Sequence, residues 1–519
     1  MKLIQLNNQL NFTVRKNLGL LSSIVLVFVL LLARVSSHKY SHDTLVAFRV
    51  LRSILIDHST LIYAMGQGWI NSFNYHFNFI YILISPLYYL GPSLLIFSWK
   101  FVCYGGFLVI LWRLIDSDHR YDISNWHKNL FLLLVALHPT FISNLISPEI
   151  WDSDLILPFL GLSILSISRN RYYWAVFWFC STFLVKEDMM LVGILYGILM
   201  ALFTKKAKFI WLSVFSLGWF WMVTHVVMPS FATSTEELGL LKFSFGNLGN
   251  SMGEIIVNSI IHPHLLIANG WWMRKFASLF IILSCVGFLP FWKKSSLIYL
   301  LPGLSVLGYT LIAVQPYLDY SKHYMVALFV FVVWSSYESY VLVNEKFRAK
   351  IVLVSVVASI AVIVVLQMNI RVWSYYLFPI ENFSTLKSVE EEFIPPKSSM
   401  LTGGVSSPWI CYRSNCFVTG DFQPGEIEKM EYDYILVNLN TVFWEVLNCS
   451  DETIAINLKK LNGNNKYQTL YYADDIVLLK KSHADAYIKQ PDWSGHLEKY
   501  QQINHDCMKS DLMRKIRLF

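Results

Sequence analysis

The side chains with the clearest capacity for chemistry gather in short segments between apolar runs. Residues 152–154 are Asp-Ser-Asp, and residues 186–188 are Lys-Glu-Asp. Carboxylates so placed can act as general bases or hold a hard cation, and lysine is a compact charge suited to a phosphate. Alternatively, Asp152 and Asp154 cap the following helix, and Lys186 does no more than neutralise the carboxylates of its own turn. Both alternatives stay open on the sequence alone.

Two other segments add candidate residues of the same kinds. Asp43 lies about ten residues after the first apolar run, where it could serve as a general base or metal ligand at the membrane surface. Its spacing favours the alternative of a helix N-cap. His76 precedes an aromatic stretch, and Lys322 and His323 precede a late apolar run.

The chain that must position these residues is strongly apolar. Of its 519 residues, 55% are hydrophobic and 15% are charged, whereas a soluble domain carries about 25% charged residues. Residues 371–519 hold 35 of the 77 charges, and residues 1–370 hold 42. The sequence therefore predicts a membrane domain over 1–370, a small soluble α/β domain over 371–481 and a polar tail over 482–519.

The apolar runs predict an all-α polytopic membrane domain with about eleven transmembrane helices. The runs are 18–33, 92–112, 129–147, 154–168, 172–185, 189–204, 209–229, 276–292, 295–315, 323–343 and 351–370. A further run, 77–90, is expected to lie in the interface, because counting it as a span would turn the later basic loops outward. Without it, 16 basic residues lie on the N-terminal, cytoplasmic side and nine on the other, as the positive-inside rule requires.

This topology makes 34–91 and 230–275 long outer loops and places the C-terminal domain outside. The outer side also receives 11 of the 16 acidic residues of 1–370, including every acidic candidate above. The basic surplus lies between apolar segments and not on a soluble face, so a nucleic acid is excluded as a partner. The sequence contains no P-loop, Gly-x-Ser-x-Gly or His-Glu-x-x-His motif, so it offers no support for an ATPase or hydrolase.

Several of these motifs, taken in order, resemble the bacterial membrane-protein family known as domain of unknown function 2079. The resemblance runs through His76-Phe77, the loop from Pro148 to Asp154, Leu184 to Asp188, His323-Tyr324 and the closing strand from Ile476 to Lys480. The His-Pro-Glu that is usual in the second of these segments is replaced here by Asp-Ser-Asp.

The layout of that family is similar to the GT-C type membrane glycosyltransferases, which transfer sugars from a polyprenyl-phosphate carrier. The resemblance implies a GT-C-like fold in the bacterial plasma membrane, with Asp43, Asp152 and Asp154 as catalytic residues or as ligands of a divalent cation. It also implies a group of substrate-binding residues, namely His76, Lys186, Glu187, Asp188, Lys322 and His323.

The leading hypothesis is a glycosyltransferase that uses a polyprenyl-phosphate sugar donor and a glycan, lipid or protein acceptor outside the plasma membrane. The alternatives are a transporter or flippase of lipid-linked sugars, and a non-catalytic envelope assembly protein. A transporter would need charged residues along its spans, where Lys100 and Glu338 stand nearly alone. This scarcity favours the enzyme.

Overall fold

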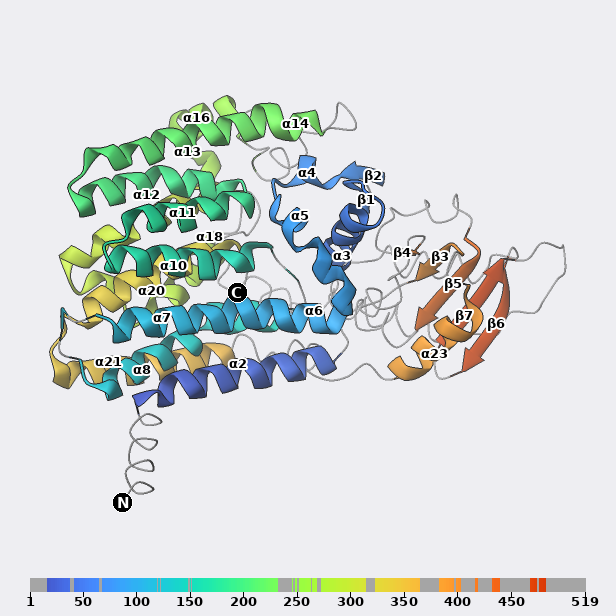
Figure 1. The fold of residues 1–519 in the computed structure, drawn as a ribbon, viewed down its shortest axis with the longest axis horizontal. Helices are drawn as coiled ribbons and strands as arrows, with labels where there is room; N and C mark the ends of the chain where they lie inside the picture. Colours follow the sequence, from blue (N-terminus) through green and yellow to red (C-terminus); the bar gives the residue numbers. More distant parts are fainter. Residues whose placement is uncertain are drawn as a thin grey trace, which may run out of the picture.

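A helical array and a five-stranded sheet make up the molecule (Figure 1). The structure is a computed structural model that describes residues 16–37, 42–64, 68–118, 120–121, 123–147, 150, 152–231, 245, 248–249, 252–262, 264–267, 272–313, 323–364, 382–395, 398–402, 416–418, 432–438, 467–473 and 476–481.

The helices of the array run roughly side by side, and the sheet lies beyond one end of them (Figure 1). α2 (Leu18–Ser36) begins at the end of the array away from the sheet. α6 (Gly91–Lys100) and α7 (Gly106–Asp116) pack beside α2. The other helices of the array are α8 (Asn125–Ala136), α9 (Pro139–Ile146), α10 (Ile156–Ser168), α11 (Tyr172–Ser181), α12 (Asp188–Thr204), α13 (Ile210–Met222), α14 (Met228–Ser230), α16 (Met252–Ile261), α17 (His264–Ile267), α18 (Trp272–Ser284), α19 (Gly303–Ile312), α20 (Val326–Tyr340) and α21 (Glu345–Val362).

Three helical runs in the described part of the chain are long and apolar enough to cross a membrane. They are Leu18–Ser36, Ile80–Asp116 and Ala207–Ser230, and α8 with α9, bent by 52°, would make a fourth. The prediction of about eleven spans is therefore not confirmed. Several other apolar runs form shorter helices, such as α10 with 13 residues and α20 with 15, fewer than the roughly 20 that a straight span needs.

The segment predicted to lie in the interface is part of the longest helical run. α5 (Ile80–Ile84) and the 3-10 helix η1 (Ser85–Leu90) lead into α6, and the whole run has 37 residues. Gly91, at the junction, has a φ of 70°, which glycine adopts without the steric penalty of a side chain. One crossing needs about 20 residues, so this run is longer than a straight span requires, and the interfacial position of its first part stays a prediction.

The described parts of residues 34–91, which we call the first outer segment after the predicted topology, fold into short elements beside this run. It comprises α3 (His42–Leu55), an antiparallel hairpin of β1 (Leu61–Ala64) and β2 (Gly68–Asn71), and α4 (Ser72–Tyr75). Asn71 caps α4, because its side-chain oxygen accepts a hydrogen bond from the backbone N–H of Phe73 at 3.1 Å. These elements bring the residue after α4, His76, to the end of the array that faces the sheet (Figure 1).

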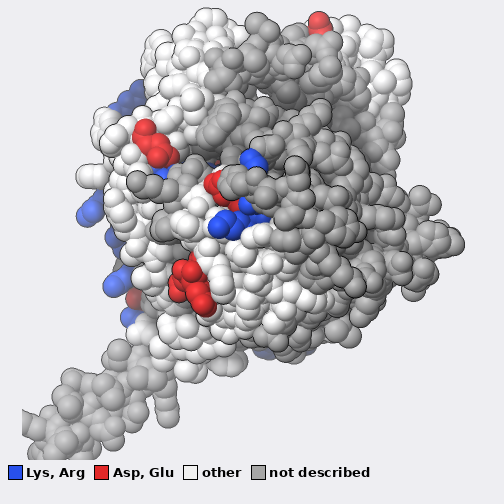
Figure 2. All heavy atoms as spheres, turned by 90° about the vertical axis from the view of Figure 1, so that its right-hand side faces the viewer, with Lys and Arg blue, Asp and Glu red and all other residues white. Residues whose placement is uncertain are grey.

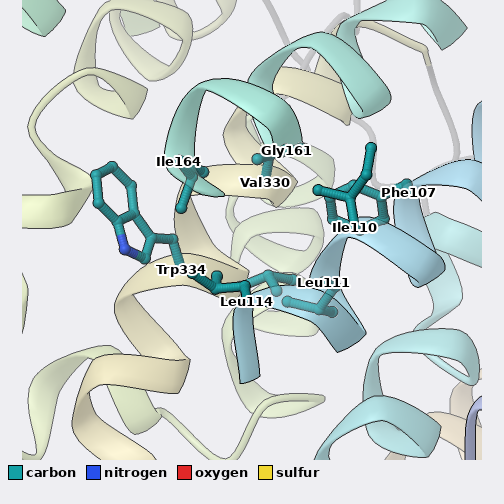
Figure 3. Close-up of a pocket in the computed structure, with 9 residues that line it drawn as sticks. Phe107, Ile110, Leu111, Leu114, Gly161, Ile164, Val330 and Trp334 are labelled. Atoms are coloured by element: carbon teal, nitrogen blue, oxygen red, sulfur yellow. The ribbon is translucent and has the colours of Figure 1, made fainter. Parts of the chain in front are cut away.

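The core of the array is built around α20. Every residue of this helix is buried, as expected for a helix that is surrounded by others. A small pocket lies between α7, α10 and α20 (Figure 3). All of its lining residues are apolar or glycine, so it belongs to helix packing; they are Phe107, Ile110, Leu111, Leu114, Gly161, Ile164, Val330, Val333 and Trp334.

The C-terminal sheet has the strand order β4-β3-β5-β7-β6. β3 (Met400–Thr402) pairs in parallel with β4 (Cys416–Val418) and β5 (Tyr434–Asn438), whereas β7 (Ile476–Lys481) is antiparallel to β5 and to β6 (Tyr467–Ala473). α23 (Phe383–Phe393) packs on the sheet. The described part of the small α/β domain predicted over 371–481 contains this sheet and α23, whereas the tail predicted over 482–519 lies outside the described residues.

Candidate functional site

Charged side chains from separate parts of the chain meet at the end of the helical array that faces the sheet. Figure 2 shows this face of the molecule. The charged side chains that meet here come from the residue after α4, from the 3-10 helix η3 (Asp152–Leu155) and from the turn before α12. We call this group the charged cluster, and its members are His76, Asp152, Lys186, Glu187 and Asp188.

Glu187 joins two of these segments. One of its carboxylate oxygens lies 3.0 Å from Nδ1 of His76. The other accepts a hydrogen bond from the backbone N–H of Phe77 at 3.1 Å. The side chains of His76 and Glu187 are each no more than 25% exposed. This contact therefore fixes the first outer segment to the turn before α12, more than a hundred residues later in the chain.

Lys186 is a buried cation that donates no hydrogen bond to a described residue through Nζ. Its Nζ lies 3.6 Å from Oδ2 of Asp188 and 3.8 Å from the ring centroid of Tyr324. The first distance is beyond hydrogen-bond range, and the second is a cation–π contact. Since Lys186 makes no hydrogen bond through Nζ to any described residue, its ammonium can donate to an anion that enters the cluster.

Asp188 presents one satisfied and one unsatisfied oxygen. Oδ2 accepts a hydrogen bond from the hydroxyl of Tyr309 in α19 at 2.7 Å. Oδ1 is buried and has no hydrogen-bond partner among the described residues. A buried acceptor without a partner is costly, so this oxygen is suited to a hydroxyl group of a ligand.

Asp152 has the properties of a general base. Its side chain is nearly buried, and Oδ1 accepts a hydrogen bond from the backbone N–H of Ser153 at 2.7 Å. Burial raises the pKa of this carboxyl above its ordinary 3.8, although the positive charges of Lys186 and His76 act in the opposite direction. A carboxylate with a raised pKa accepts a proton more readily near neutral pH.

Contacts within the cluster favour the charged forms of His76, Glu187 and Lys186. Burial alone would lower the pKa of His76, but the Glu187 carboxylate raises it overall above 6.5. Burial would likewise raise the pKa of Glu187, but His76 and Lys186 lower it to about 2. For Lys186, burial lowers the pKa, but Asp188, Tyr324, Asp152 and Glu187 together raise it.

Replacing Glu187 by glutamine is expected to lower the melting temperature of the protein most strongly between pH 4.5 and 6.5. The contribution of Glu187 is complete above its ordinary pKa of 4.5 and is lost as the pH falls through about 2. The contribution of His76 is complete below 6.5 and is lost as the pH rises through its raised pKa. The measurement is the melting temperature of both proteins across the pH range in detergent. A difference that stays constant with pH would contradict the ion pair.

Asp154 lies in a second, fully buried group. Its carboxylate is 2.8 Å from Nζ of Lys100 and accepts a hydrogen bond from the hydroxyl of Tyr104 at 2.8 Å. Lys100 also donates to the backbone carbonyl of Asn144 at 2.8 Å. The side chains of Lys100 and Asp154 have no exposed surface. Asp154 therefore anchors η3, and with it Asp152, to the helical run that carries Lys100 and Tyr104.

Replacing Lys100 by methionine is expected to destabilise the protein by about 3–5 kcal/mol, because it leaves the buried Asp154 carboxylate without its cation. Unfolding in detergent, measured as a free energy, is the test. The double variant Lys100→Met/Asp154→Leu removes both charges and should recover most of this loss. A double variant that is less stable than Lys100→Met would contradict the pairing.

The structure brings most of the predicted site residues together. His76, Asp152, Lys186, Glu187 and Asp188 form the charged cluster. His323 begins the 3-10 helix η9 (His323–Met325), which packs against η3. Asp43 is the second residue of α3, but its side chain, like all of Lys322, lies outside the described residues.

The predicted ligands of a divalent cation are not gathered around one position in the described residues. In the part of the chain that the structure describes, no group of three or more His, Cys, Asp or Glu side chains could hold a metal ion. The Asp154 carboxylate is turned to Lys100 and Tyr104, so it does not share a cation with Asp152 here. A metal held by Asp43, Asp152 and Asp154 stays a prediction.

Sequence reasoning missed the two tyrosines that complete the cluster. Tyr309 lies within an apolar helix, and nothing in its spacing distinguishes it from a packing residue. Tyr324 directly follows the candidate residue His323. This neighbouring position was the one sequence feature that could have identified Tyr324. Both lie more than a hundred residues from the Lys-Glu-Asp turn that they contact.

Comparisons with known proteins add a family and a distant structural likeness. No curated protein matches the chain. A cryo-EM structure of the arabinofuranosyltransferase AftD from Mycobacteria is similar with a TM-score of 0.42 and 10% identity, over 91% of this chain and 40% of that one. The chain thus spans less than half the length of that protein. The family described as "Predicted membrane protein (DUF2079)" matches residues 52–478, and the chain therefore belongs to this family of membrane proteins.

Proposed function

We propose that this membrane protein transfers a sugar from a polyprenyl-phosphate-linked donor to a hydroxyl acceptor at the charged cluster, on the extracytoplasmic face. The observation that carries the proposal is the buried ammonium of Lys186, which makes no hydrogen bond to a described residue and lies beside carboxylates. A phosphate needs such a cation, and a hydroxyl acceptor needs such a carboxylate.

The proposed step uses the two kinds of group in different ways. The oxygen of the acceptor hydroxyl attacks the anomeric carbon of the sugar, and the bond between that carbon and the phosphate oxygen breaks. Asp152 takes the proton of the hydroxyl. The electron pair of the broken bond stays on the polyprenyl phosphate, whose growing negative charge Lys186 stabilises. Asp188 Oδ1 is free to accept a hydrogen bond from a sugar hydroxyl.

The lipid chain of such a donor has an apolar surface to follow. The helical run that begins at Ile80 passes the first outer segment and carries large apolar side chains on its outside. Leu83 is 67% exposed, Tyr89 72% and Leu94 52%. Surfaces of this kind favour a membrane or a lipid chain over water.

The opposite end of the array supports an enzyme over a transporter. Asp116 pairs there with Lys16 at 3.1 Å and with Lys128 at 3.5 Å. Arg120 pairs with Glu338 at 2.8 Å, so this acidic residue does not line an open path. Lys100 is likewise held by Asp154. An alternating-access transporter would have to separate such contacts in every cycle.

The lipid that remains bound during purification tests the proposal. Native mass spectrometry of the protein from bacterial membranes should detect polyprenyl phosphate or its sugar derivative on the wild type and much less on Lys186→Met. Lys350→Met, at an exposed lysine, is the control and should retain the lipid. Absence of polyprenyl lipid from the wild type would contradict the proposal, and a stoichiometric protein partner in its place would favour an envelope assembly protein.

A further inference from the structure

A second charged surface lies at the other end of the helical array. α10 and α12 both start beside the charged cluster, so the turns that follow them lie away from it (Figure 1). Both turns are rich in basic residues. We call these residues the basic platform, and its members are Arg169, Arg171, Lys205, Lys206 and Lys208.

The basic platform carries a charge that the protein does not neutralise. All five of its side chains are exposed. None forms an ion pair with a carboxylate in the part of the chain that the structure describes. Two other cations at this end differ, since Lys16 pairs with Asp116 and Arg120 with Asp118. Unpaired like charges repel one another, so five of them on two adjacent turns favour an anion from outside the protein.

Contacts between the two turns make them one surface. The rings of Tyr172 and Phe209 lie edge to face, with centroids 6.1 Å apart. Nζ of Lys206 lies 5.4 Å from the ring centroid of Tyr172. Nζ of Lys208 lies 2.7 Å from the hydroxyl oxygen of Tyr173. The lysines after α12 are therefore held against the residues that follow Arg171.

The aromatic residues around the basic platform indicate its depth. Tyr173 is 75% exposed, Trp174 55% and Trp211 73%. Exposed tyrosine and tryptophan side chains on a membrane protein lie at the level of the lipid headgroups. The neighbouring cations then lie at the level of the lipid phosphates.

We infer that the basic platform binds the phosphate-bearing headgroup of an anionic phospholipid. Its cations complement the phosphate, and its exposed rings extend toward the acyl chains. A zwitterionic lipid carries no net charge and is bound less well by the same residues. This surface is separate from the charged cluster, so the inference does not depend on the proposed function.

Lipid titration with native mass spectrometry tests this inference on the full-length protein. The probes are phosphatidylglycerol and phosphatidylcholine. The wild type should prefer phosphatidylglycerol, and Lys206→Gln/Lys208→Gln should weaken that preference about tenfold or more. The control, Lys293→Gln/Lys294→Gln, removes the same charge from another exposed turn and should keep the preference. The inference is overturned if the wild type does not prefer phosphatidylglycerol, or if both double variants lose the preference equally.

Discussion

Replacing Lys186 by methionine is expected to reduce the rate of sugar transfer about a hundredfold to a thousandfold, the usual effect of removing one group that stabilises charge in the transition state. Methionine keeps much of the length and apolar character of the side chain but removes the ammonium. The leaving phosphate would then lose the cation that Asp188 and Tyr324 hold in place. The measurement is kcat and KM for release of polyprenyl phosphate in proteoliposomes.

Lys186→Arg is the matched control for this variant. Arginine keeps the positive charge but has a planar and wider head group, so part of the activity should return. The melting temperature of both variants shows whether the cluster remains folded. Full activity in Lys186→Met would contradict a role of Lys186 in phosphate binding.

Replacing Asp152 by asparagine is expected to reduce kcat about a hundredfold to ten-thousandfold, the range that general base catalysis contributes. Asparagine has nearly the same shape and can keep the contact with the backbone N–H of Ser153, but it cannot take a proton. The effect should fall on kcat more than on KM, because proton transfer takes place in the reaction step.

The pH profile separates this role from a structural one. Transfer by the wild type should fall as the pH decreases through the pKa of Asp152, which burial raises above 3.8. Asp152→Asn should lack this acidic limb. Asp57→Asn, at an exposed carboxylate that pairs with Arg52 at 3.2 Å, should keep both the rate and the limb. An unchanged limb in Asp152→Asn would assign the base to another residue.

Local sequence patterns predicted the features that depend on residues close together in the chain. The Lys-Glu-Asp turn between two apolar runs was visible because three charges there are costly in a membrane. The closing strand from Ile476 to Lys480 was also expected, and β7 lies there.

Contacts between distant segments could not be predicted in this way. Spacing does not show that His76 meets Glu187, or that Tyr309 reaches Asp188. Asp152 and Asp154 also look equivalent in the sequence, yet only the second is enclosed with Lys100. The prediction of about eleven spans is not confirmed, since in the described residues three helical runs, or four with the bent pair, are long and apolar enough to cross a membrane.

The geometry also changes the meaning of the intramembrane charges. In the sequence, Lys100 stood out as one of two nearly isolated charges along the predicted spans, where charged residues are often functional. In the structure it is a positioning residue, which holds Asp154 and thereby η3. Replacing Lys100 should therefore reduce sugar transfer only as far as it destabilises the protein. Replacing Lys186 should reduce sugar transfer in a protein that remains folded.

The most direct test of the central claim is acceptor-dependent release of polyprenyl phosphate. Proteoliposomes with the wild type, Asp152→Asn or Lys186→Met would receive polyprenyl-phosphate-linked pentoses and hexoses together with a panel of hydroxyl acceptors, and mass spectrometry would detect both products. We expect release of polyprenyl phosphate and a glycosylated acceptor with the wild type for at least one pair, and a loss of about a hundredfold or more in both variants. Release that is equal in the wild type and the variants, or no greater than in empty liposomes for every pair, would contradict the account.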